Sequence, residues 1–137
     1  MVPKFYKLSN GFKIPSIALG TYDIPRSQTA EIVYEGVKCG YRHFDTAVLY
    51  GNEKEVGDGI IKWLNEDPGN HKREEIFYTT KLWNSQNGYK RAKAAIRQCL
   101  NEVSGLQYID LLLIHSPLEG SKSVSYTHLT LPTICSV

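Results

Sequence analysis

Three short apolar runs each end in a residue that can take part in acid–base chemistry. Asp45, Lys81 and His115 stand at these ends, and Tyr50 follows Asp45 by five positions. If the runs are neighbouring parallel strands, their carboxyl ends meet at one edge of the sheet, and we expect the four side chains to converge there. Each residue taken singly has an ordinary structural explanation, such as a turn cap, a surface lysine or a histidine satisfied at a strand end.

The four side chains together suit the reduction of a carbonyl group. A phenol is a poor acid at neutral pH, but an adjacent ammonium group stabilises the phenolate. Lys81 would supply that ammonium to Tyr50, and Asp45 would supply the counter-charge that keeps a buried lysine protonated. His115 would orient the substrate carbonyl beside the phenol. Such a set forms a general-acid site that lacks only a source of hydride.

The elements that must position these residues follow from hydrophobic patterning. Asn10-Gly11 between the apolar runs 5–8 and 12–14 predicts an opening β-hairpin. Short apolar runs then alternate with segments whose apolar residues recur at helical spacing. Four strands are predicted, at residues 17–19, 41–44, 76–80 and 109–114.

Three helices are predicted between these strands. Ser27 is the expected N-cap of the first helix, and Gly40 lies just past its end. Asn52, with Glu55 three residues later, predicts a capping box at the start of the second helix. Gly105 is expected to close the third helix.

This alternation predicts an α/β fold. Strands such as residues 111–114 are apolar throughout, which is typical of a parallel sheet buried on both faces. Two architectures fit: an open doubly wound sheet, or part of a (β/α)₈ barrel. A complete barrel needs ~250 residues, whereas this chain has 137. The barrel interpretation therefore gives a truncated half-barrel with a hairpin, four strands and three helices.

Composition narrows the class of partner. Sixteen Lys and Arg against fourteen Asp and Glu leave a net charge of +2, too small for charge-driven binding to nucleic acid or to a membrane surface. We expect no membrane partner, because no apolar run reaches the ~18 residues of a membrane-spanning helix. The start of the chain lacks a signal-peptide pattern, so the predicted location is the cytoplasm. Cys39, Cys99 and Cys135 are too widely spaced to indicate a disulfide framework or a zinc site, and no metal is expected.

The last fifteen residues differ from the rest of the chain. Residues 123–137 contain no Lys, Arg, Asp or Glu and show no helical period where a fourth helix is due. Their sequence resembles the translation of a sequencing adapter, so we predict a partial barrel over residues 1–122 and a non-native or unstructured tail over 123–137. The alternative is an edge strand or a loose natural tail.

Four segments, residues 40–47, 50–53, 79–83 and 110–117, resemble the signature segments of the aldo-keto reductases. The resemblance covers residues 3 to about 122, includes the hairpin, and is greatest to the small fungal reductases. It implies the N-terminal half of a (β/α)₈ TIM barrel that binds NADPH over its strand ends and reduces aldehydes or ketones.

The resemblance also implies catalytic roles residue by residue. Tyr50 matches the family's proton donor and Lys81 the residue that makes it acidic. Asp45 matches the partner of that lysine, and His115 matches the group that orients the carbonyl.

Further matches concern the cofactor and the substrate. Gly20, Thr21 and Tyr22, together with Asp45, match the segment that lines the cofactor site. Trp83, with His115, matches a wall of the substrate pocket. In that family the second half-barrel grips the rest of the cofactor, including its 2′-phosphate, so the preference for NADPH over NADH comes from the resemblance alone.

The leading hypothesis is thus a fragment of an NADPH-dependent reductase of small carbonyl compounds whose parent protein is monomeric. Unpaired sheet edges and an apolar inner face would make residues 1–137 by themselves inactive and prone to self-association. Two alternatives remain. One is a non-catalytic, cofactor-binding regulatory or scaffold relative, and the other is a genuine half-barrel module that self-associates to complete its fold.

Overall fold

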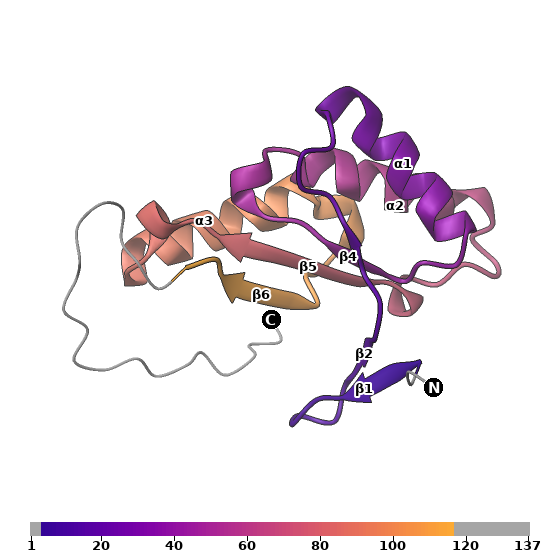
Figure 1. Cartoon of the computed structure of the whole chain (residues 1–137), viewed down its shortest axis with the longest axis horizontal. Coiled ribbons are helices and arrows are strands. Elements are labelled where there is room, and N and C mark those ends of the chain that lie inside the picture. Colours follow the sequence, from indigo (N-terminus) through magenta and orange to yellow (C-terminus); the bar gives the residue numbers. More distant parts are fainter. Residues whose placement is uncertain (1–3, 117–137) are drawn as a thin grey trace.

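A β-hairpin opens the chain and leads into a parallel sheet that carries three α-helices (Figure 1). The computed structural model describes residues 4–116, so the predicted tail and Cys135 lie outside the described residues. The hairpin pairs β1 (Phe5–Lys7) with β2 (Lys13–Pro15) in antiparallel register. Gly11 adopts a left-handed φ of 91°, and Asn10 Oδ1 accepts a hydrogen bond from the backbone N–H of Phe12 at 3.1 Å. The prediction of a hairpin turn at Asn-Gly is confirmed.

The main sheet has four parallel strands in chain order. Each of the four predicted strands is present, beginning one or two residues later than the sequence pattern indicated. The strands are β3 (Leu19–Gly20), β4 (His43–Asp45), β5 (Phe77–Leu82) and β6 (Leu111–Ile114).

Helices connect successive strands of this sheet. The α-helices are α1 (Arg26–Lys38), α2 (Glu53–Glu66) and α3 (Tyr89–Glu102). Four short 3₁₀ turns complete the described elements: η1 (Val48–Tyr50), η2 (Arg73–Glu75), η3 (Asn84–Gln86) and η4 (Ser104–Leu106). Within residues 4–116, no helix combines the length and the apolar character that crossing a membrane requires.

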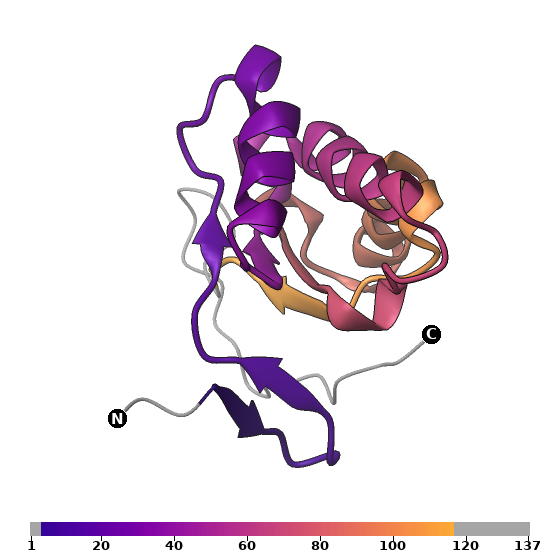
Figure 2. The same ribbon diagram turned by 90° about the vertical axis from the view of Figure 1, so that its right-hand side faces the viewer.

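The strand order decides between the two predicted architectures. Crossovers between parallel strands are right-handed, so strands added in chain order place every connecting helix on the same face of the sheet. Figure 2 shows α1, α2 and α3 on one side and the hairpin extending away from them. A doubly wound sheet reverses its strand order and carries helices on both faces. The described residues therefore have the arrangement of (β/α) barrel units, in a sheet that is not closed.

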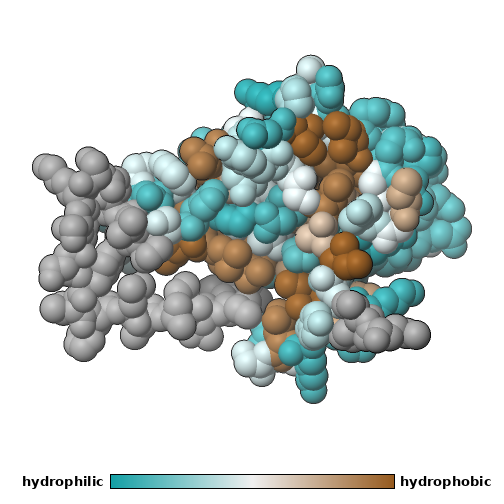
Figure 3. All heavy atoms as spheres, in the orientation of Figure 1, coloured by the Kyte–Doolittle hydropathy of each residue, from teal (hydrophilic) through white to brown (hydrophobic). Residues whose placement is uncertain are grey.

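Burial on both faces is found in the middle strands, where successive residues of β4 and β5 are buried, but not in β6 at the edge of the described sheet. Leu113 and Ile114 of β6 remain partly exposed among the described residues. Figure 3 shows hydrophobic residues along the lower border of the body, between the sheet and the hairpin. A run of apolar residues indicates that both faces of a strand are apolar. It does not distinguish a face covered by helices from one that faces a barrel interior.

Two predicted caps are also wrong. The hydrogen bonding of α1 begins at Pro25, whose carbonyl accepts from the N–H groups of residues 28 and 29, so Ser27 lies inside the first turn. The third helix ends before Gly105, which lies within η4, and the left-handed residue that follows is Gln107, with φ 70°.

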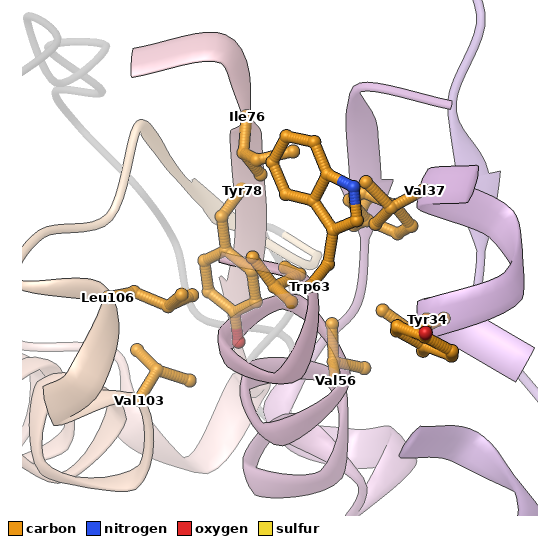
Figure 4. Close-up of a cluster of buried hydrophobic side chains, with 11 residues drawn as sticks. Tyr34, Val37, Val56, Trp63, Ile76, Tyr78, Val103 and Leu106 are labelled. Carbon is orange, nitrogen blue, oxygen red and sulfur yellow. The ribbon is translucent and has the colours of Figure 1, made fainter. Parts of the chain in front are cut away.

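The core fills the space between the helices and the sheet. Trp63 of α2 and Tyr78 of β5 lie near its centre (Figure 4). Burial of each large side chain of this kind contributes ~1.5–3 kcal/mol. Gly59 lets α1 and α2 approach closely, because a Cβ at that position would lie 2.4 Å from the carbonyl oxygen of Ala30. The other buried members are Val33, Tyr34, Val37, Phe44, Val56, Ile60, Ile76, Val103 and Leu106.

A buried arginine ties β5 to the start of β6. The Arg73 guanidinium donates hydrogen bonds to the carbonyl oxygens of Ile76, Leu106 and Tyr108 and pairs with Asp110 Oδ2 at 2.6 Å. The same carboxylate oxygen accepts from the N–H of Tyr78 at 2.9 Å. These bonds fix β6 beside β5 and so determine where the residue after β6 emerges.

Candidate active site

The carboxyl ends of β4, β5 and β6 bring three predicted site residues to one edge of the sheet. Asp45 ends β4, Lys81 lies near the end of β5, and His115 follows β6 directly. The backbone N–H of His115 donates to the carbonyl oxygen of Leu82 at 3.0 Å, which continues the strand pairing by one residue.

The ammonium group of Lys81 lies at the centre of this edge. It donates hydrogen bonds to Asp45 Oδ1 at 2.5 Å, to the carbonyl oxygen of Thr46 at 2.9 Å and to the hydroxyl oxygen of Tyr50 at 3.3 Å. An ammonium group has three N–H donors, so all three are used. The Lys81 side chain is only 14% exposed and that of Asp45 is 32% exposed, which limits screening of their charges by water. From this position Lys81 can stabilise negative charge on the Tyr50 oxygen.

Local backbone geometry presents Tyr50 to the lysine. Tyr50 ends the 3₁₀ turn η1, in which its N–H donates to the carbonyl of Ala47 at 2.9 Å. Gly51 follows in the left-handed region with φ 66° and donates to the carbonyl of Val48 at 3.2 Å. A glycine adopts this conformation without strain, and the chain then turns into α2.

Aromatic rings surround the Tyr50 phenol. The ring of Tyr22 meets the Tyr50 ring edge-on at a centroid distance of 5.1 Å, and the ring of His115 does so at 5.7 Å. Trp83 packs edge-on against His115 at 5.3 Å. Within the described part of the chain, Nδ1 of His115 is buried and has no hydrogen-bond partner.

An open cavity of about 500 Å³ lies beside the phenol. Its lining is mainly apolar and aromatic but includes one acidic and one basic side chain: Tyr22, Asp23, Ile24, Pro25, Arg26, Leu49 and Tyr50. A larger hollow of about 660 Å³ lies near Trp63 and His71 and contains none of the strand-end residues. The smaller cavity is the candidate ligand site, because two of the predicted site residues, Tyr22 and Tyr50, line it, whereas none lines the larger hollow.

The predicted cofactor-lining segment divides into exposed and buried parts. Gly20 and Tyr22 are exposed at the end of β3. Thr21 is fully buried, and its hydroxyl lies within hydrogen-bond distance of the Asp45 carbonyl oxygen, at 3.3 Å, and of Asn52 Oδ1, at 3.4 Å. The Thr21 side chain therefore joins strand ends together and faces away from the cavity.

Sequence reasoning missed two features of the site. Leu49 and Arg26 line the cavity, but neither belongs to a pattern that marks a binding residue. The predicted capping box at α2 is also absent, since the Asn52 side chain makes no cap hydrogen bond and Glu55 bonds to Arg26 at 2.8 Å. Asn52 is instead buried within the site's supporting structure, and its position at a helix start concealed that role.

Comparisons with known proteins all point to one family. The Aldo/keto reductase family model matches residues 16–129. The D/L-glyceraldehyde reductase of Hypocrea jecorina is 48% identical over 111 residues, covering 81% of this chain and 33% of that protein. The NAD(P)H-dependent D-xylose reductase of Candida tenuis is 46% identical over 112 residues, covering 82% of this chain and 34% of that protein. The chain thus spans about a third of the length of the curated relatives it matches.

Solved structures agree with this family. An aldo-keto reductase from Bombyx mori in complex with NADP superposes with a TM-score of 0.75 at 39% identity, covering 82% of this chain and 38% of that one. An aldo/keto reductase from Brucella melitensis gives a TM-score of 0.73 at 41% identity, covering 84% of this chain and 41% of that one. Both are (β/α)₈ barrels, and the parallel sheet with its helices corresponds to part of such a barrel. The chain therefore belongs to the aldo/keto reductase family.

Proposed function

We propose that the whole protein to which these residues belong reduces aldehydes or ketones to alcohols with NADPH and uses Tyr50 as the proton donor. The observation that carries this proposal is the Lys81 ammonium, bonded to Asp45 on one side and to the Tyr50 hydroxyl on the other. A lysine held in this way supports proton donation by a phenol, because it stabilises the phenolate that remains.

Carbonyl reduction adds a hydride to carbon and a proton to oxygen. The nicotinamide of bound NADPH supplies the hydride. Tyr50 gives its proton to the carbonyl oxygen as negative charge develops there, and Lys81 stabilises the resulting phenolate. Asp45 supplies a counter-charge beside the Lys81 ammonium, and the His115 ring, which packs edge-on against the Tyr50 ring, would orient the carbonyl oxygen beside the phenol.

The described residues fit one end of that cofactor and a small substrate. Tyr22 and Tyr50 line the cavity of about 500 Å³, and exposed Gly20 precedes them at the strand end. Together with Asp45, these residues would hold the part of NADPH that carries the nicotinamide. Thr21 would support them from behind, because its N–H and carbonyl groups are bonded to Asp45 and Asn52. Trp83, packed against His115, would form a wall for the substrate. The relatives named as NADPH-dependent or NAD(P)H-dependent reductases support this choice of cofactor.

Replacement of Tyr50 by Phe in the whole protein tests the proposal. The variant keeps the aromatic ring but loses the acidic hydroxyl, so aldehyde-dependent NADPH oxidation should fall by about 100- to 10,000-fold. Quenching of protein fluorescence by NADPH should remain close to that of the parent. Equal turnover by both proteins would refute the role of Tyr50, and NADPH binding without turnover by the parent would favour a regulatory or scaffold relative.

We also propose that residues 1–137 expressed alone self-associate and reduce no aldehyde at an appreciable rate. Among the described strands, β3 and β6 each have one unpaired edge, and the hairpin exposes Phe5, Tyr6 and Phe12. Edges and apolar patches of this kind pair with other chains. Sedimentation should show large or mixed species, whereas a discrete, active monomer would contradict this expectation.

The division at residue 122 is likewise a proposal, since it lies outside the described residues. Genomic reads that continue past the codon for Lys122 would test it. Codons for an amphipathic helix in place of residues 123–137 are expected. Independent reads that reproduce the tail would overturn the proposed boundary.

A further inference from the structure

Asn52 is a buried polar residue whose side chain makes no cap hydrogen bond to the helix that it begins. It is 1% exposed and precedes α2, but no side-chain cap hydrogen bond to that helix is present. An N-cap asparagine ordinarily accepts a hydrogen bond from an N–H group in the first helical turn. Loss of that bond is unfavourable unless other partners replace it, so the observed partners of Asn52 indicate what the residue does.

The Asn52 amide bonds to the two loops that follow β3 and β4. Its Nδ2 group donates to the carbonyl oxygens of Thr21 at 2.9 Å and of Ile24 at 3.3 Å. Its Oδ1 atom accepts from the Thr46 hydroxyl at 3.0 Å and lies 3.4 Å from the Thr21 hydroxyl. A side-chain amide offers two N–H donors and two acceptor lone pairs. Both donors are used here, and the oxygen accepts from Thr46 and shares the single Thr21 hydroxyl hydrogen with the Asp45 carbonyl.

One of these loops leads directly to the proton-donor site. Thr46 is fully buried, its hydroxyl donates to Asn52, and its carbonyl oxygen accepts a hydrogen bond from Lys81 Nζ at 2.9 Å. Its N–H also donates to the carbonyl of Thr79 on β5 at 2.9 Å. Asn52 therefore holds one of the two groups, Asp45 and Thr46, that aim the Lys81 ammonium at Tyr50.

The other loop supports the opposite side of the phenol. The carbonyls of Thr21 and Ile24, both bonded to Asn52, flank Tyr22 in the sequence. The Tyr22 ring packs edge-on against the Tyr50 ring at 5.1 Å. The same amide thus fixes both the loop behind the lysine and the loop that carries the aromatic wall.

We propose that Asn52 is a positioning residue for carbonyl reduction, because it holds Thr46 and the segment 21–24 so that Lys81 and Tyr22 both contact Tyr50. This inference rests on the proposed function. Loss of the two amide donors leaves buried carbonyl oxygens unpaired, and the loops must shift to satisfy them. A displacement of ~1 Å in a reacting geometry can cost ~100-fold in rate.

The test uses Asn52→Asp in the whole protein, because aspartate keeps the shape of asparagine but has no N–H donor when ionised. We expect kcat to fall by about 10- to 100-fold, with a change in KM for the carbonyl substrate of about threefold or less. Asn70→Asp is the matched control at an exposed position, where the Asn70 amide bonds only to Asp67. Ile60→Val, in the core on α2, shows what simple destabilisation does to kcat.

A second variant separates positioning from general stability. Thr46→Val removes the hydroxyl that links Asn52 to the Lys81 loop and retains the volume of the side chain. If Asn52 acts through Thr46, the double variant should lose little more kcat than Asn52→Asp alone, because the two changes break one connected network. Losses that multiply, or a kcat decrease no larger than that of Ile60→Val at equal thermal stability, would overturn the proposal.

The outcomes distinguish this inference from the proposed function. If the parent oxidises NADPH with an aldehyde and depends on Tyr50, but Asn52→Asp and Thr46→Val retain its kcat, only the role of Asn52 is refuted. If the parent shows no Tyr50-dependent reduction, the proposed function fails and the positioning role fails with it. Should Asn52→Asp not fold, Thr46→Val alone decides, since its kcat must still fall with KM nearly unchanged.

Discussion

Replacement of Lys81 by methionine removes the ammonium group and retains much of the side chain's length and volume. The Lys81 Nζ atom lies 3.3 Å from the Tyr50 oxygen. A unit charge on each atom at that distance interacts by about 5 kcal/mol at an effective dielectric constant of about 20, and by about 2.5 kcal/mol at about 40. Because each 1.36 kcal/mol corresponds to a factor of ten, stabilisation of the phenolate by this lysine amounts to about 70-fold to about 5,000-fold in rate.

The assay is aldehyde-dependent oxidation of NADPH by the whole protein, followed by absorbance, with kcat calculated per folded molecule. Lys62→Met is the matched control, because the Lys62 ammonium also lies over a tyrosine ring, 3.8 Å from the Tyr34 centroid, but on the exposed surface of α1 and α2. We expect Lys81→Met to lower kcat within the calculated range and Lys62→Met to leave it unchanged. A Lys81→Met enzyme that retains a third or more of the parent kcat would refute the electrostatic role.

Three further predictions concern stability of the whole protein in urea. Arg73→Met should lower the free energy of unfolding by about 3–5 kcal/mol, because it leaves the buried Asp110 carboxylate without its cation and three carbonyl oxygens without the guanidinium donor; a loss below about 1 kcal/mol would count against this. Gly59→Ala should cost about 1–3 kcal/mol, since the new methyl group meets the Ala30 carbonyl oxygen at 2.4 Å, and an unchanged midpoint would show that the two helices separate freely. Burial raises the pKa of the Glu53 carboxyl. The hydrogen bond from the Thr80 hydroxyl acts in the opposite direction but is the smaller effect. The folded state therefore holds this proton more tightly than the unfolded state, and the contribution of Glu53 to stability falls as pH rises above the unfolded pKa. Glu53→Gln should gain stability relative to the parent as pH rises above the ordinary carboxyl pKa of 4.5, and a difference that does not vary with pH would contradict the assignment.

The placement of the strand-end residues could be predicted because it depends on local patterns. Asp45, Lys81 and His115 each end an apolar run, and parallel strands bring such ends to one edge whatever the details of packing. The hairpin could also be predicted from the sequence, since Asn10-Gly11 favours one type of turn. These features require only the strand period and the turn residues, both of which are written in short stretches of sequence.

The role of Asn52 could not be predicted in the same way. Asparagine before a helix with glutamate three residues later is typical of a capping box, but tertiary partners compete for both side chains. The buried carbonyls of Thr21 and Ile24 take the amide, and Arg26 takes Glu55. These competing partners lie about 30 residues away in sequence, so a pattern read from neighbouring residues cannot reveal them.

The exposure of β6 could not be predicted from its own residues for a related reason. Residues 111–114 are apolar at every position, which favours burial on both faces. Only the strand order shows that all three helices lie on one side, because that order determines where right-handed crossovers place them.

A double-mutant cycle between Tyr50→Phe and Lys81→Met tests whether the lysine acts through the phenol. The rate of hydride transfer from bound NADPH to an aldehyde is measured in a single turnover for the parent, both single variants and the double variant. Because Lys81 serves by stabilising the Tyr50 oxygen, the lysine substitution should have almost no further effect once that oxygen is gone. An equal loss from Lys81→Met in the presence and absence of the Tyr50 hydroxyl would contradict that role.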